Sequence, residues 1–556
     1  MSQLRTSGEH RQTPCLDSLC SQPLAYCSAR LFPPIARVRV DPLPSPVQPS
    51  LIDATQAFRD TEIFLTGANG FVGKVVLGLL VDRFPDFKHL HILMRGKAGN
   101  PPEERFQKDV LGSPSLKPVV ERRGKAAFLD KITLHLGDVS QPQFGLTDET
   151  LASLRGRVGI LINCAGLVEF FPPVDESFRS NVDGAESSVV VAEKLAAKLV
   201  HISTCFVCGE SDGLVEESEP ILGYYPRRKG PHDRSFRFDE EIKFIREQVA
   251  AIRDRAARSP RRVAPKEIAQ QLIDLGTQRA AQWGWVNIYT YSKSLGEQII
   301  ASQPNLEWAI VRPAIVEAAL EFPFPGWVEG GRTAAPLVMM AMAGLRHWPL
   351  RPDAPMEVVP VDQVGTSILT AAAALHQGVK NKVYQIGTAD SNPIPLGSIV
   401  DWMHEEYRRE KKKWLPTGGV KIVSAATAKR RGERLIARLA GLQYLATGMR
   451  KVAQRSGLPG RRALGGLATQ LRMLGLQVNI REQTLALYQP FMLDNRFIFE
   501  AENIRAAHAS LTEADRARLP WSPEKIDWRR YWIDNEVAGI QKWVAAEFMK
   551  GKSFKI

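Results

Sequence analysis

From Thr61 onward, short apolar runs alternate with stretches long enough to form helices. Six of these runs, each four to six residues long, are Glu62–Thr66, Leu90–Met94, Ile132–Leu136, Val158–Asn163, Leu199–Ser203 and Trp308–Val311. Apolar runs of this length are typical of strands buried on both faces of a parallel sheet, and helix-sized intervals between them indicate βαβ units. The pattern therefore predicts an α/β fold, a doubly wound parallel-sheet Rossmann-like domain over about residues 56–400.

The pattern differs in three other regions of the chain. Residues 1–55 hold eight of the 37 Pro and no apolar periodicity, which predicts a flexible N-terminal extension. Residues 227–279 are rich in Arg and Lys, and we expect them to form surface helices inserted in the α/β domain. Residues 415–556 contain amphipathic stretches of helix length and almost no strand pattern, so we expect a smaller helical C-terminal domain there.

Charge is unevenly distributed along the 556 residues. The whole chain carries 73 Lys and Arg against 60 Asp and Glu, but residues 408–472 alone hold 17 Lys and Arg and two acids. Such a block attracts polyanions, which include nucleic acid, an anionic lipid surface, an acidic carrier protein and the phosphates of a nucleotide-containing substrate. A solvated helical face without any partner is the alternative interpretation.

Cysteine usage and hydropathy bear on the compartment. The six Cys are scattered, which argues against a disulfide framework and favours a reducing, cytoplasmic location. Cys205-Phe206-Val207-Cys208 has no second pair at metal-ligand spacing, so no metal site is predicted. The longest apolar candidate, Ala334–Leu345, is too short to span a bilayer, although contact with a membrane surface remains open.

The first predicted strand runs directly into a glycine-rich loop. Gly67, Gly70 and Gly73 are spaced G-x-x-G-x-x-G, with Asn69, Phe71 and Val72 between them, and an apolar helix follows. Glycine at these positions permits a tight turn and a close approach to a pyrophosphate, and the helix N-terminus supplies N–H donors. The loop therefore predicts a dinucleotide-binding site.

Residues after the next strands refine this site. Arg95 ends the second strand, where an NAD enzyme places an acid and a cation accommodates the 2′-phosphate of NADP, so NADPH is favoured. Asp138, after the third strand, is expected near the adenine. Asn163 and Ala165, after the fourth, are expected to form the floor of the cofactor site. Each of these four residues could instead be an ordinary strand-end residue.

A candidate catalytic group follows further along the chain. Tyr289 and Lys293 form a Tyr-x-x-x-Lys pair on one helix face, where a nearby ammonium is expected to lower the pKa of the phenol. Ser203 and Thr204 end the fifth strand, a suitable place for a donor to a carbonyl oxygen. Thr204 is preferred as that donor, with Ser203 as a cap of the following turn.

In this order along the chain, these residues resemble the extended short-chain dehydrogenase/reductase superfamily. Narrower segments are similar to the fatty acyl-CoA reductase family: Leu161–Phe170, Ile310–Val316, Glu321–Val328, Val359–Val364, Asp494–Asn503 and Ile526–Trp532. The resemblance covers about residues 60–545. Gly166 stands where the family often has Ala, and residues 408–472 are unusually basic.

The resemblance implies a function and residue roles. Tyr289 would be the general acid, Lys293 would also bind the nicotinamide ribose, and Thr204 would polarise the carbonyl. The substrate would be a long-chain acyl-CoA, or an acyl carrier protein thioester, reduced by two NADPH to a fatty alcohol through an aldehyde.

Three alternatives remain. The enzyme could stop at the aldehyde, since the same residues serve both steps. A sugar-nucleotide epimerase or dehydratase with NAD is disfavoured by Arg95. A basic module for nucleic acid or anionic membrane is disfavoured as the sole function by the intact Thr204, Tyr289 and Lys293 set, so nucleic acid is not an expected partner.

Overall fold

The computed structural model describes residues 51–96, 101–230, 232–331, 333–410, 419–456 and 461–545. All of them belong to one compact unit, Ser50–Ile556. Residues 1–50 of the predicted N-terminal extension lie outside the described residues. The folded part begins slightly before the predicted boundary, because Ile52 pairs with Leu511 and helix α1 begins at Ala54.

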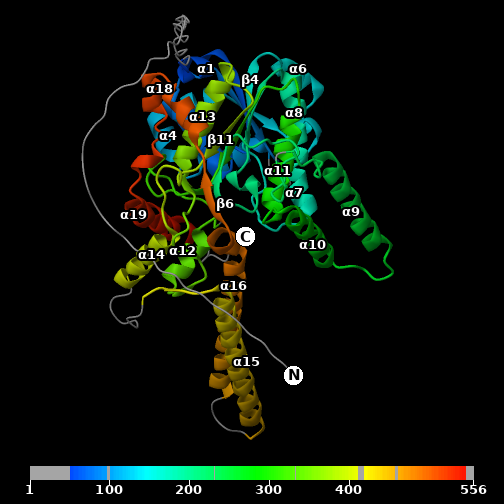
Figure 1. The fold of residues 1–556 in the computed structure, drawn as a ribbon, viewed down its shortest axis with the longest axis vertical. Coiled ribbons are helices and arrows are strands. Elements are labelled where there is room, and N and C mark those ends of the chain that lie inside the picture. Colours follow the sequence, from blue (N-terminus) through cyan, green and yellow to red (C-terminus); the bar gives the residue numbers. More distant parts are fainter. Residues whose placement is uncertain are drawn as a thin grey trace, which may run out of the picture. The chain divides into compact units, whose positions relative to one another are not determined.

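A seven-stranded sheet in which every strand is parallel forms the centre of the fold (Figure 1). The strand order is β11-β7-β5-β4-β1-β2-β3, so the chain extends the sheet in one direction and then in the other from β1. The strands are β1 (Glu62–Thr66), β2 (His89–Met94), β3 (Ile132–Leu136), β4 (Val158–Asn163), β5 (Lys198–Ile202), β7 (Trp308–Pro313) and β11 (Lys382–Ile386). The six predicted strands are confirmed, whereas β11 was not predicted.

Alternate residues of each strand enter two different hydrophobic cores. In β1, Ile63 and Leu65 pack with one helical layer and Phe64 with the other. The first layer contains α1 (Ala54–Asp60), α2 (Phe71–Arg83), α13 (Val361–His376) and α17 (Glu502–Ala509), and the second contains α7 (Val174–Asn181), α8 (Asp183–Leu195) and α11 (Ile288–Ala301). Burial on both faces explains why the strands are apolar without alternation.

The Arg- and Lys-rich interval forms the expected helices. They are α9 (Phe238–Arg258) and α10 (Pro265–Trp283), drawn in green beside α7 and α11 in Figure 1. Shorter helices surround β2, β3 and β4: α3 (Pro102–Arg105), α4 (Lys117–Arg123), α5 (Lys125–Asp130) and α6 (Asp148–Leu154).

The C-terminal region is mainly helical, as predicted, and it packs into the same compact unit as the sheet. Its strand β13 (Arg496–Phe499) pairs in parallel with β6 (Asp212–Val215), and α17 contacts β11. Further helices are α12 (Ala335–Met342), α14 (Leu396–Glu410), α18 (Glu513–Arg518) and α19 (Trp528–Arg530), and the short strand pairs are β8 (Ile315–Glu317) with β10 (Val358–Pro360) and β9 (His347–Trp348) with β12 (Lys421–Ile422).

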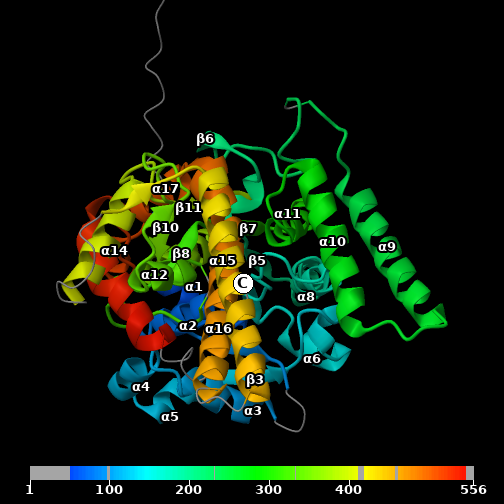
Figure 2. The ribbon, with the colours of Figure 1, turned by 90° about the horizontal axis from the view of Figure 1, so that it is seen from below.

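Two long helices lie between α14 and β13. They are α15 (Ala425–Arg455) and α16 (Arg461–Gln489), which pack along each other (Figure 2). Among the described residues, none of the helices combines the length and the apolar character that crossing a membrane demands.

Candidate active site

A cavity of about 600 Å³ lies at the carboxyl ends of the central strands. Its wall includes the whole segment Asn69–Gly73, together with Thr204 and Tyr289. Strands β1 and β4 are neighbours here, at the point where the order of the sheet reverses, which is where doubly wound sheets bind their ligands. The topology thus brings the predicted cofactor loop and two predicted catalytic residues together.

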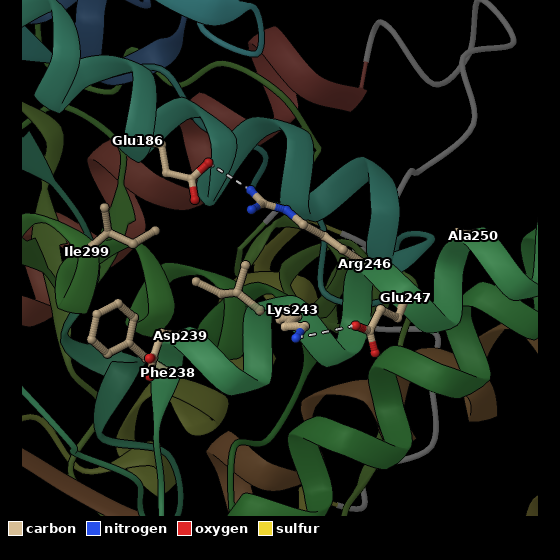
Figure 3. A pocket seen from close by; sticks show the side chains of 9 residues that line it. Glu186, Phe238, Asp239, Lys243, Arg246, Glu247, Ala250 and Ile299 are labelled. Carbon is tan, nitrogen blue, oxygen red and sulfur yellow. Dashed lines mark hydrogen bonds and ion pairs between the residues drawn. The ribbon is translucent and has the colours of Figure 1, made fainter.

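A second hollow, of about 520 Å³, lies on α9 and is lined by none of the predicted site residues (Figure 3). Its charged side chains neutralise one another. Arg246 contacts Glu186 at 2.7 Å, and Lys243 contacts Glu247 at 4.0 Å. The first cavity is therefore the better candidate for an active site.

Close backbone approaches require glycine at two of the three glycine positions of the loop, Gly67 and Gly73. Gly67 has a φ of +72°, and a Cβ placed there would lie 2.7 Å from the backbone of Cys164 and of Ala165. A Cβ at Gly73 would lie 2.1 Å from the carbonyl oxygen of Gly67. Gly70 is the N-cap of α2 and offers no side chain, so the first N–H groups of α2 remain available at the cavity. The cradle fits a pyrophosphate.

The two charged residues predicted for the cofactor site lie together at the ends of β2 and β3. Arg95 Nη1 is 3.7 Å from Asp138 Oδ2, and the Arg95 side chain is 61% exposed. Asp138 Oδ1 also accepts hydrogen bonds from the backbone and hydroxyl of Ser140, at 3.0 and 2.9 Å. The guanidinium is therefore anchored beside a carboxylate and still open to solvent.

Asn163 occupies a buried network beneath the glycine loop. Its Oδ1 accepts from Thr66 Oγ1 at 2.6 Å, and its Nδ2 donates to Ser188 Oγ at 2.8 Å. Thr66 Oγ1 in turn accepts from the Ala165 N–H at 3.2 Å. This amide joins β1, β4 and α8 and holds the loop that carries Ala165, while Cys164 and Gly166 line the cavity. A direct contact of Asn163 or Ala165 with a cofactor stays a prediction.

Thr204 and Tyr289 both line the cavity, and the Thr204 hydroxyl donates to the carbonyl oxygen of Pro313 at 3.3 Å. Thr204 Oγ1 accepts from the Phe206 N–H at 3.3 Å, so Thr204 caps the turn at residues 205–208. The prediction that Ser203 caps this turn is wrong, because the turn begins at Cys205 and Thr204 occupies the N-cap position. Tyr289 lies in the first turn of α11, which Asn287 caps by accepting from the Thr290 N–H at 2.9 Å.

Lys293 lies one turn further along α11 and is buried. Its Nζ donates to the carbonyl oxygen of Ile202 at 2.7 Å, and burial lowers its pKa to about 8. A Cβ at Gly166 would lie 3.2 Å from this Nζ and 3.1 Å from Asn181 Oδ1, so glycine leaves room for the ammonium. The departure from the family's usual Ala thus has a local reason.

The expected effect of Lys293 on Tyr289 is not found. Burial raises the pKa of the Tyr289 phenol, and the hydrogen bond with Thr204 only partly opposes that rise. Cys205 and Glu297 raise the pKa further, and Lys293 is directed to Ile202 instead. The prediction of a lowered phenol pKa is therefore wrong, and Tyr289 keeps its proton at neutral pH.

The acid Glu357 lines the cavity and was not predicted from the sequence. Its Oε1 accepts from the Phe499 N–H at 2.6 Å and its Oε2 from the Thr388 N–H at 2.9 Å, while burial raises its pKa to about 7. A lone acid beside the apolar pair Val358-Val359 was the available signal.

Aromatic residues from distant segments form the rest of the wall. Phe206, two residues after Thr204, makes edge contacts with Phe491 and Phe497 at 5.2 Å between centroids, and Phe170 stacks on Phe491 at 5.4 Å. Phe322 and Trp327 are buried in the core, so the segment Phe322–Trp327 is a packed loop rather than a cavity wall. The C-terminal region thus contributes Tyr488, Phe491, Met492 and Phe497 to an apolar wall that the α/β domain also forms.

The predicted apolar segment Ala334–Leu345 forms α12 and belongs to the core. Val338 and Ala341 are buried, and Met339 packs against the same cluster. Ala334 and Leu337 line the cavity. Cys205 and Cys208 are buried free thiols, and the described part of the chain contains no group of three or more His, Cys, Asp or Glu suited to a metal ion.

Comparison with known proteins identifies the family of this chain. The family model described as Male sterility protein matches residues 65–368. The alcohol-forming fatty acyl-CoA reductase of Simmondsia chinensis is 28% identical over 364 residues, 64% of this chain and 71% of that protein. Fatty acyl-CoA reductase 1 of Arabidopsis thaliana is 24% identical over 502 residues, 88% of this chain and 98% of that protein.

Solved structures share the fold. The terminal R domain from the myxalamid PKS-NRPS biosynthetic pathway aligns with a TM-score of 0.51 at 16% identity, covering 91% of this chain and 93% of that domain. The matched family model spans more than half of the chain and contains the glycine loop, Thr204, Tyr289 and Lys293. The chain therefore belongs to the Male sterility protein family, as a fatty acyl-CoA reductase family member of the extended short-chain dehydrogenase/reductase superfamily.

Proposed function

We propose that this protein reduces long-chain acyl-CoA to fatty alcohol with NADPH, through an aldehyde intermediate. One observation carries the proposal: a single cavity of about 600 Å³ joins the glycine loop, the Thr204–Tyr289 pair and an aromatic wall. A dinucleotide cradle beside two hydroxyl donors suits carbonyl reduction, and the apolar wall suits an acyl chain.

Two features support NADPH as the cofactor. Gly67 and Gly73 leave no space for side chains, and Gly70 at the N-cap of α2 leaves the first N–H groups of the helix open, as a pyrophosphate site requires. Arg95 is exposed at the end of β2, where a guanidinium can pair with a 2′-phosphate. When bound there, the reduced nicotinamide supplies a hydride.

Thr204 and Tyr289 would bind the carbonyl oxygen of the thioester. Both residues line the same cavity, so a carbonyl oxygen bound there can accept from the Tyr289 phenol and from Thr204 once its hydroxyl turns away from the carbonyl of Pro313, which stabilises the negative charge that develops there. Reduction of the carbonyl carbon gives a hemithioacetal oxyanion, and its collapse breaks the C–S bond, releasing CoA thiolate and an aldehyde.

The aldehyde would be reduced by the same residues. Its oxygen takes the same position, and the phenol of Tyr289 gives its proton to the alkoxide. Burial raises the pKa of Tyr289, so the phenol carries its proton at neutral pH, and the more basic alkoxide can still take that proton. Lys293, with a pKa of about 8, remains largely cationic at neutral pH and is placed to hold the loop around Gly166.

The proposal is tested by incubating the purified chain anaerobically with NADPH and palmitoyl-CoA. Nicotinamide absorbance, released CoA thiol and the lipid product by mass spectrometry are followed together. Fatty alcohol with two NADPH consumed for each CoA supports the proposal. NADH in place of NADPH should react more slowly, and palmitoyl carrier protein tests the thioester preference.

Other outcomes are informative. Aldehyde with one NADPH per CoA would overturn the alcohol product, and no oxidation with any acyl thioester would overturn the reductase proposal. Thr204→Val should lose most turnover, because it removes a donor to the oxyanion. Ser203→Ala is the matched control, since Ser203 is adjacent and buried and does not line the cavity.

A further inference from the structure

The helices α15 and α16 pack through small residues. Ala428, Gly432, Ala446 and Ala453 are buried on α15, and a Cβ at Gly432 would lie 2.4–2.7 Å from side-chain atoms of Glu482 on α16. Small residues allow two helix backbones to approach closely. The larger apolar side chains of α15 therefore lie outside the contact with α16.

Those larger side chains form an exposed stripe. On α15, Leu442, Leu445, Met449 and Val452 are between 52% and 61% exposed, and Leu435 is 38% exposed. At about 100° per residue, their spacing places all five within about 100° of one another. An exposed apolar stripe of this length on a water-facing helix indicates an interaction surface.

The stripe continues across α16. Leu467 and Leu474 are exposed. About the axis of α16 they lie to one side of the residues that contact α15, and the stripe on α15 lies to the same rotational side of the residues that contact α16. Because the two helices are antiparallel, the same displacement places both sets on one side of the pair. We call this surface the apolar face, formed by Leu435, Leu442, Leu445, Met449, Val452, Leu467 and Leu474.

Basic residues accompany the apolar face. Helix α15 contains eight Lys and Arg and a single acid, Glu433. Arg431, Arg434 and Arg438 are exposed and lie one to two turns from Leu435 and Leu442 on the same side of the helix. A helix with an apolar stripe and flanking cations is typical of segments that lie in a membrane interface.

The apolar face is connected to the active-site cavity by the chain itself. Helix α16 ends at Gln489, and Tyr488, Phe491 and Met492 at this end line the cavity. The hydroxyl of Tyr488 donates to the carbonyl oxygen of Thr333, another residue of the wall. The helix that carries part of the apolar face thus also forms the acyl end of the cavity.

We propose that the apolar face and its flanking arginines bind the surface of an anionic lipid bilayer. The cations match a negative surface and the leucines match the acyl boundary beneath it, whereas a nucleic acid would need only the charge. A second copy of this chain is disfavoured, because two equally basic faces repel each other. The membrane would supply acyl chains and take up the product, a role that rests on the proposed function, while the binding itself does not.

The test uses flotation of the full-length protein with vesicles, without substrate. Vesicles of phosphatidylcholine mixed with phosphatidylglycerol should carry the protein, and phosphatidylcholine alone should carry far less. Arg431→Gln/Arg434→Gln/Arg438→Gln should weaken binding on the order of 100-fold at low salt. The matched control neutralises three exposed cations on the inserted helices and their connection and should bind normally: Arg255→Gln, Arg258→Gln and Arg262→Gln.

A second pair of variants tests the apolar contribution. Leu445→Ser/Met449→Ser/Val452→Ser should abolish flotation, because the cations alone bind weakly. The control set, Met473→Ser/Leu476→Ser/Ile480→Ser, removes equally exposed apolar side chains from the opposite face of α16 and should leave flotation unchanged. Thermal melting verifies that each variant folds.

Three results would overturn the proposal: no flotation of the wild type with anionic vesicles, equal losses in a test set and its control, or a salt-stable dimer that buries the apolar face. RNA binding that outcompetes the vesicles would likewise replace the lipid with nucleic acid as the partner. Turnover of soluble acyl-CoA without vesicles is measured separately, so a failure of membrane binding is distinguishable from a failure of the reductase function.

Discussion

Replacing Gly73 by Ala separates two opposing effects in the cofactor loop. Gly73 lies in the first turn of α2, where Ala is preferred by helix propensity by about 1 kcal/mol. Yet a Cβ there would lie 2.1 Å from the carbonyl oxygen of Gly67, more than 1 Å closer than an ordinary contact. Both partners are backbone atoms, so neither can rotate away.

The packing effect should dominate. Overpacking of a well-packed site costs about 1–3 kcal/mol, so Gly73→Ala should lower the free energy of unfolding by about 1–2 kcal/mol despite its better propensity. The displaced loop should also weaken NADPH binding by at least about tenfold, which corresponds to 1.4 kcal/mol. Thermal unfolding measures the first effect and titration calorimetry with NADPH the second.

Gly70→Ala is the matched control within the same loop. A Cβ at Gly70 would lie 3.2 Å from the same carbonyl oxygen, and this contact needs a shift of only a few tenths of an ångström. Gly70→Ala should therefore retain most of its NADPH affinity. If Gly73→Ala were more stable than the wild type, or bound NADPH as well as Gly70→Ala, the packing argument would be refuted.

Three further predictions concern the active site and the core. Tyr289→Phe should lower kcat for palmitoyl-CoA by about 10²–10⁴-fold with unchanged NADPH affinity, since it removes only the acid; a comparable loss of affinity in calorimetry would contradict this. Arg95→Ala should reduce the preference for NADPH over NADH by about 10- to 100-fold, measured as the ratio of kcat/KM values, and an equal loss with both cofactors would disprove the 2′-phosphate contact. Glu317 and Glu536 are buried against each other and their pKa values are raised, so the folded state loses stability as pH rises above about 4.5, where the unfolded carboxyls ionise. Glu536→Gln should therefore raise Tm more at pH 8 than at pH 5. At pH 8 the gain should correspond to about 1 kcal/mol or more in the free energy of unfolding, and an equal gain at both pH values would refute this.

Some features of this protein follow from local sequence. Three of the six predicted strands have the observed bounds, and the others differ by one or two residues, because apolar runs between helix-length stretches can be buried only as parallel strands. The glycine loop was also recognisable, since Gly67 needs a positive φ and Gly73 a missing side chain. Strand β11 escaped prediction because it is short and contains Lys382 and Gln385.

Other features depend on contacts between distant segments. Strand β13 pairs with β6 across almost 300 residues, and that pairing brings Phe491 and Phe497 against Phe206 to form the cavity wall. No local pattern encodes such a contact. The same holds for Glu357, whose pKa is raised by burial although the N–H groups of Thr388 and Phe499 oppose that rise.

The sequence by itself determined the sheet, the cofactor loop and the identity of Thr204, Tyr289 and Lys293, because these depend on periodicity and spacing along the chain. Only the tertiary structure decided where the polar groups of these residues point. Lys293 is directed to the carbonyl oxygen of Ile202, and burial raises the pKa of Tyr289 instead of lowering it. The physical reason is that desolvation and hydrogen-bond partners are set by the surrounding fold, which spacing on a helix does not specify.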